Sequence, residues 1–272
     1  MNLLKAVLFG IAAAVLVALV LVGPRGFRAP VSEPAELRVM IEAPPVRPER
    51  STDVRARLEA ALFAVPEYRP FAEKLREAYP AEYDAALARG VERYGIAARL
   101  DPPDQFVLDA VAALRRGRGR LAAVSRDDAL AALFQAQGAT LAALADTDSR
   151  LCVGFLYGSA GAGFTTFAGT HRDLVARLAQ AGLDAVIDGQ SAHVLRRAPS
   201  DADFSVIEHE LTGRGLGRTE IDALLDGRMP DPPLPDDQLC RASLAYLDVL
   251  GNLPLASRMA IYALSVELMS RS

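Results

Sequence analysis

Residues 151–164, with the sequence LCVGFLYGSAGAGF, place one of the two cysteines of the chain among four glycines. Such a combination could set a nucleophile beside a loop that binds phosphate. The spacing fits none of the relevant motifs. No lysine follows the glycines as in a P-loop, Thr166 stands where a dinucleotide-binding fingerprint needs its third glycine, and Tyr157 stands where a nucleophile elbow needs its first. We therefore predict that this stretch ends one helix at a glycine-rich turn, which leads to a helix start at Thr170.

The three histidines, His171, His193 and His209, are the other candidates for acid–base chemistry or metal binding. His209 lies between two glutamates, but a metalloprotease helix would need a second histidine at the position of Gly213. Successive residues on a helix also point in different directions, so neighbours cannot form one site. The sequence therefore predicts no catalytic, cofactor-binding or metal-ligating residue, and no cofactor. A hydrolase that pairs Cys152 with a histidine through the fold stays open as an alternative.

The two cysteines, Cys152 and Cys240, both fall on apolar faces of expected helices. In an oxidising compartment two such cysteines are expected to form a disulfide. Closing a loop of roughly 90 residues would contribute up to about 4.5 kcal/mol on the chain-entropy model. We therefore predict a Cys152–Cys240 disulfide. Two unpaired cysteines acting as small apolar side chains are the alternative.

The segment between Lys5 and Arg25 carries no charge, and its apolar part, residues 6–22, would form a helix about 26 Å long. No A-x-A-like cleavage site follows, so we predict an uncleaved transmembrane signal anchor over residues 1–23. The positive charges on its two sides are nearly balanced and decide little about orientation. Anchors this close to the N-terminus usually leave the rest of the chain outside the cytoplasm. We expect a single-pass protein of a bacterial inner membrane, with its body in the periplasm.

The chain beyond the anchor divides into a tether and a helical body. Residues 24–50 contain six prolines, which predict a semi-rigid, extended tether. Residues 51–272 show apolar spacing typical of helices, and we predict an all-α domain of about ten helices, with the C-terminal helix pair at 236–270 packed back on it. Helix starts are indicated by a hydroxyl residue three positions before an aspartate. This pattern occurs at Ser125, Thr170, Ser200 and Thr219.

The charge of the chain argues against a nucleic-acid partner. The formal net charge is −4, and acidic and basic residues are interspersed. The one dense basic cluster, RRGRGR at residues 115–120, is interpreted as a solvated helix end followed by a glycine-rich turn.

An anchor, a spacer and a helical body without a catalytic motif favour a protein that presents a surface in the cell envelope. We predict a non-catalytic interaction or scaffold domain with a protein partner there. A Cys- or His-dependent hydrolase and a carrier of small apolar ligands are the alternatives, and the oligomeric state is left open. The last helix, LASRMAIYALSVELM, is apolar on more than one face, so it must be buried centrally or cover a partner.

Overall fold

The computed structural model describes residues 51–97, 103–157, 161–226 and 230–271; the predicted anchor (1–23) and tether (24–50) lie outside these ranges. The all-α prediction is confirmed for the described part, which contains twelve helices rather than about ten and no strand. The helices are α2 (Ser51–Phe63), α3 (Arg69–Ala78), α4 (Pro80–Ala97), α5 (Pro103–Ala122), α6 (Asp127–Thr147), α7 (Ser149–Leu156), α8 (Gly161–Thr170), α9 (Arg172–Ala192), α10 (Asp201–Gly213), α11 (Arg218–Asp226), α12 (Asp236–Asn252) and α13 (Leu255–Ser270).

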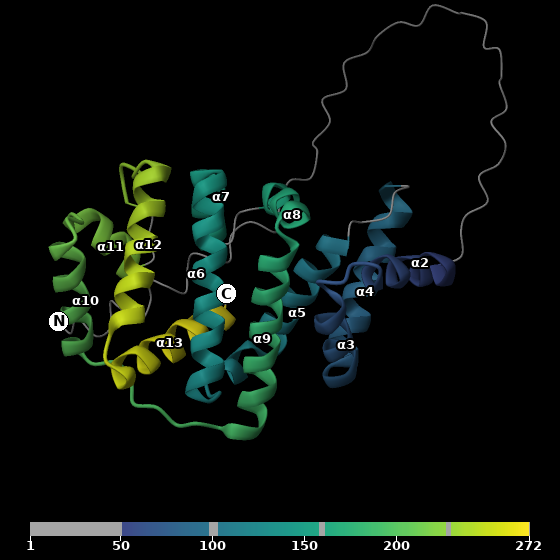
Figure 1. Cartoon of the computed structure of the whole chain (residues 1–272), viewed down its shortest axis with the longest axis horizontal. Coiled ribbons are helices and arrows are strands. Elements are labelled where there is room, and N and C mark those ends of the chain that lie inside the picture. Colours follow the sequence, from purple (N-terminus) through teal and green to yellow (C-terminus); the bar gives the residue numbers. More distant parts are fainter. Residues whose placement is uncertain (1–50, 98–102, 158–160, 227–229, 272) are drawn as a thin grey trace, which may run out of the picture.

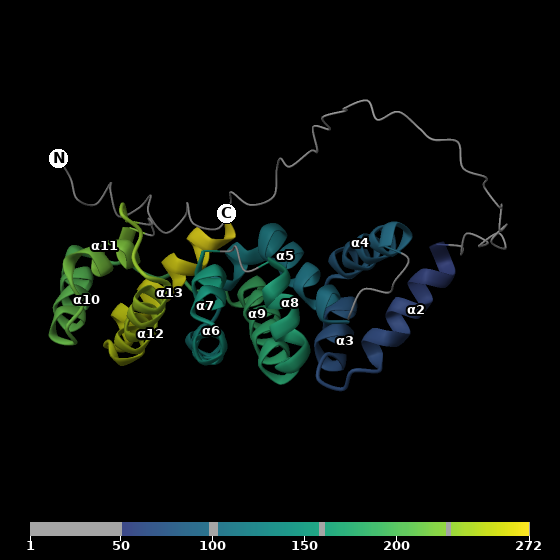
Figure 2. The ribbon, with the colours of Figure 1, turned by 90° about the horizontal axis from the view of Figure 1, so that it is seen from above.

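The helices lie side by side in an elongated row, with α2, α3 and α4 at one end and α10 and α11 at the other (Figures 1 and 2). The middle of the row is held together by α9, which packs against both α5 and α6. Helix α13 contacts α5, α6 and α12, and in Figure 1 it runs across the direction of α6 and α12. The last helix therefore occupies the central, buried position, which was one of the two options predicted for it.

Apolar spacing explains why α9 can join two neighbours. Val175, Ala179, Leu183 and Val186 recur at helical intervals and are all buried. Short side chains on this helix also let its backbone approach α5. At Gly189, a Cβ atom would lie only 1.8 Å from the backbone oxygen of Leu121. A glycine is therefore required where α9 passes the C-terminal end of α5.

One of the four predicted capping boxes forms. The Ser200 hydroxyl accepts a hydrogen bond from the Asp203 backbone N–H, and the Asp203 carboxylate accepts one from the Ser200 backbone N–H at 2.7 Å. Arg197 donates two further hydrogen bonds to Asp203, at 2.6 and 2.8 Å. These hydrogen bonds, with that of Arg197 as the largest contribution, hold the pKa of Asp203 well below its usual range.

The other three boxes were wrong. The Ser125 hydroxyl donates to the Ala122 carbonyl at the end of α5, and the Thr170 hydroxyl donates to the Phe167 carbonyl within α8. Thr219 lies inside α11 instead of before it. The first two connections are so short that the hydroxyl residue completes the preceding helix and leaves the cap of the next one unformed.

Both glycine-rich segments also differ from the prediction. Residues 115–120 continue α5 as a regular helix, and the expected turn at this position does not occur. Helix α7 does end after Leu156, but the glycines from Gly161 onward belong to α8. Gly163 lies against α7, where a Cβ atom would meet the Leu151 side chain at 2.4 Å. This glycine therefore lies within a helix, at its contact with α7, rather than in a flexible turn.

Candidate functional site

The two cysteines form the predicted disulfide. Cys152 of α7 and Cys240 of α12 are joined with a Cα–Cα distance of 5.9 Å across 88 residues of sequence, and both are buried. Because α7 follows α6 directly and packs against it, the bond fastens α12 to the α6–α7 pair. While this bond is intact, Cys152 has no thiolate with which to act as a nucleophile.

An open groove lies beside the helix that the disulfide fastens. Its walls come from α6 and α12 and its floor from α13, and its volume is about 330 Å³. We call it the α6–α12 groove; it is lined by Phe134, Gln135, Gly138, Ala139, Leu244, Leu247, Asp248, Gly251 and Tyr262. Leu244 and Leu247 lie on the same face of α12 as Cys240, one and two turns further along. The disulfide therefore fixes the wall from which these leucines project.

At the floor of the α6–α12 groove, an aromatic ring of α6 meets one of α13. The rings of Phe134 and Tyr262 stack in parallel, with centroids 3.7 Å apart and planes 2° apart. Burial raises the pKa of Tyr262, so this side chain remains neutral at physiological pH. Glycine and alanine at positions 138 and 139 leave the groove open above the rings. Such a surface suits the apolar side chain of a binding partner.

The rim of the α6–α12 groove carries polar groups. Gln135 is exposed on the α6 side. On the α12 side, Asp248 pairs with Arg214 of the α10–α11 connection at 2.5 Å. The groove thus has an apolar centre and a polar edge, the arrangement typical of protein-binding surfaces.

A buried charged cluster lies elsewhere, between α3, α5 and α9. Asp104 is buried and accepts hydrogen bonds from the Tyr68 hydroxyl at 2.7 Å and from Arg172 at 2.9 and 3.2 Å. Burial alone would raise the pKa of Asp104, but the hydrogen bonds from Arg172 and Tyr68 outweigh it and lower the pKa. Because every partner is satisfied within the fold, this cluster acts as a link between three helices.

The three histidines lie apart from one another. His171 precedes α9, with its ring stacked on Phe167 at a centroid distance of 4.2 Å. His193 ends α9 in the left-handed region, with φ at 47°. His209 stands in the middle of α10. In the described part of the chain, no group of three or more His, Cys, Asp and Glu side chains is arranged to hold a metal ion.

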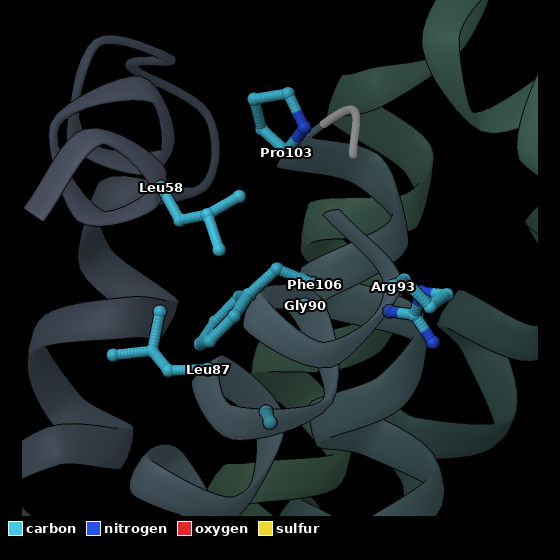
Figure 3. Close-up of a pocket in the computed structure, with 7 residues that line it drawn as sticks. Leu58, Leu87, Gly90, Arg93, Pro103 and Phe106 are labelled. Atoms are coloured by element: carbon cyan, nitrogen blue, oxygen red, sulfur yellow. The ribbon is translucent and has the colours of Figure 1, made fainter. Parts of the chain in front are cut away.

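Figure 3 shows a second hollow, between α2, α4 and α5, lined in part by Leu58, Leu87, Arg93 and Phe106. Its volume is about 10 Å³, which is close to the minimum for a single water molecule. We interpret it as a small packing gap, not as a binding site.

No protein-family model, curated protein or solved structure matches the chain. Across the described residues, no single helix is long and apolar enough to cross a membrane, although α7 and α8 taken together, bent at their junction, would meet that criterion of length and composition.

The sequence does not indicate the α6–α12 groove as a site, because Phe134 and Tyr262 are far apart along the chain and no pattern predicts that their rings stack.

Proposed function

We propose that this chain is a membrane-anchored protein of the bacterial envelope whose helical body binds a protein partner through the α6–α12 groove. The observation that carries the proposal is the position of the disulfide. The Cys152–Cys240 bond fastens α12, and α12 supplies one wall of the groove. Structural disulfides persist in oxidising compartments, so this support for the groove fits a body that lies in the periplasm.

The sequence supports the placement of the body. The uncharged apolar segment at residues 6–22 would anchor the chain in the inner membrane, and the proline-rich residues 24–50 would hold the body away from the bilayer. A groove with an apolar floor and a polar rim on a tethered body favours a binding or scaffolding role.

The location is tested by the redox state of the two cysteines. Cells are quenched in acid and treated with a maleimide polymer, with and without prior reduction. We expect labelling of Cys152 and Cys240 only after reduction. Labelling of both thiols without reduction would contradict the periplasmic location.

The binding surface is tested by photocrosslinking in the same cells. A photoreactive amino acid replaces Gln135 on the rim of the groove or, as a control, exposed Glu73 at the other end of the row. We expect a discrete adduct from Gln135 alone, and its loss when Ala139→Trp fills the groove. Identical adducts from both positions, or an adduct that persists in Ala139→Trp, would rule out the groove as the partner's site.

A further inference from the structure

A cavity distinct from the α6–α12 groove lies in the middle of the row, enclosed mainly by α5, α6, α9 and α13. We call it the α5–α9 cavity. Its volume is about 190 Å³, and its apolar lining includes Val111, Leu114, Leu133, Phe155, Leu183 and Val266. Several of these side chains are only partly buried, so the cavity presents apolar surface that no other part of the described chain covers. Apolar cavities of about 150 Å³ can hold a molecule such as benzene. The α5–α9 cavity therefore has room for an acyl chain of about six to eight carbon atoms.

Two polar side chains, Arg115 and Gln137, also line this cavity. Among the described residues, the Arg115 guanidinium has no ion-pair partner, and its Nε atom is buried without a hydrogen bond. Two other arginines of the same helix are paired: Arg118 with Glu82 at 2.6 Å and Arg120 with Glu267 at 3.7 Å.

An unpaired cation beside apolar walls is costly unless a counter-charge reaches it. Burial, together with the adjacent charge of Arg116, lowers the pKa of Arg115, although the group stays protonated at physiological pH. Glu267 of α13, a helix that packs against α5, pairs with Arg120 and Arg271 instead. A counter-charge from outside the described part of the chain would therefore stabilise Arg115.

We propose that the α5–α9 cavity binds a single-chain anionic amphiphile, with the acyl chain among the apolar side chains and the anionic head group paired with Arg115. Gln137 supplies an amide that can donate a second hydrogen bond to the head group. A carboxylate and a phosphate monoester share the chemistry that Arg115 recognises. This site goes beyond partner binding at the α6–α12 groove and does not depend on it.

The test measures binding of octanoate, octyl phosphate, octanol and octylamine by titration calorimetry. The full chain is held in nanodiscs of zwitterionic lipid, and empty nanodiscs provide the background. We expect the two anions to bind and the alcohol and the amine to bind at least tenfold more weakly. The ratio between the anions assigns the head group as carboxylate or phosphate. Shortening octanoate to hexanoate should weaken binding about fourfold for each methylene removed.

Three variants separate the contributions of charge and space. Arg115→Gln should weaken octanoate binding about tenfold or more, whereas Arg116→Gln, at an exposed position next to it, should leave binding unchanged. Gly182→Leu keeps Arg115 but places a side chain in the cavity, since a Cβ atom at Gly182 has no contact closer than 3.9 Å. We expect it to abolish binding while the melting temperature is kept or raised.

The proposal is overturned if octanoate does not bind the wild type, if octylamine binds as well as octanoate, or if Gly182→Leu binds octanoate normally. Equal effects of Arg115→Gln and Arg116→Gln would also overturn it. Because Gly182→Leu acts without removing the arginine, a folding defect in Arg115→Gln would leave the test intact.

Discussion

The approach of α9 to the end of α5 offers a sharp test of the fold through Gly189→Ala. A Cβ atom at this position would lie 1.8 Å from the Leu121 oxygen and 2.7 Å from the Leu121 carbonyl carbon. Ordinary contacts between carbon and oxygen are about 3.3 Å or longer. The two helices would therefore have to separate by about 1.5 Å. No side-chain rotation can relieve the contact, because the three nearest atoms, which come from Leu121 and Ser125, all belong to the backbone.

The expected cost follows from these contacts. Overpacking of a well-packed core costs about 1–3 kcal/mol, and a clash with backbone belongs at the upper end of this range. Replacing a helical glycine by alanine returns about 1 kcal/mol through helix propensity. The net loss in the free energy of unfolding is then about 2 kcal/mol, which corresponds to a melting temperature lowered by about 4–8 °C in a body of this size.

The assay is thermal unfolding of the full chain, followed by far-UV circular dichroism. Gly117→Ala in α5 is the matched control, since its nearest neighbour, an oxygen of Glu82, lies 3.9 Å from the new Cβ atom. We expect Gly117→Ala to raise the melting temperature by about 2–4 °C, because it gains helix propensity without a clash. If Gly189→Ala is as stable as Gly117→Ala, α9 does not pass the end of α5 as described.

Further predictions concern the links between helices. Cys152→Ala, which removes the disulfide, should lower the free energy of unfolding by about 2–5 kcal/mol. Adding Cys240→Ala should lower it little further, since the first change already breaks the bond. Thermal melts with and without reductant check this, and reductant should not affect the double variant. Asp104→Asn should lower the free energy of unfolding by about 1–3 kcal/mol at neutral pH. The pKa of Asp104 is lowered on folding, so its contribution is present above pH 4 and is lost as the pH falls through the folded pKa. Melts from pH 7 to pH 3 should show the difference between wild type and variant shrinking; a constant difference would refute the assignment. Ser200→Ala should lower the free energy of unfolding by about 1 kcal/mol, and Thr219→Ala should leave it almost unchanged, because only the Ser200 hydroxyl caps a helix. Equal melting temperatures of the two variants would contradict this.

The sequence by itself determined the helical class and the identity of the covalent link. Apolar residues at helical intervals, as in α9, require one face of a helix to be buried whatever lies against it. With two cysteines on apolar helix faces, only one intramolecular disulfide was available, and the structure contains it. The box at Ser200 could also be predicted, because an extended connection precedes it and leaves its hydroxyl available to α10.

The tertiary structure decided which helices meet and what remains unpaired. Periodicity shows that a face is buried but not what it is buried against, so neither the stacking of Phe134 on Tyr262 nor the approach of Gly189 to Leu121 could be predicted. Local patterns failed at Ser125, where a short connection gave the hydroxyl to the preceding helix. Arg115 looked like one more solvated arginine in a basic cluster. Only the packing of α5 against its neighbours places this residue beside an apolar cavity without a counter-charge in the described chain.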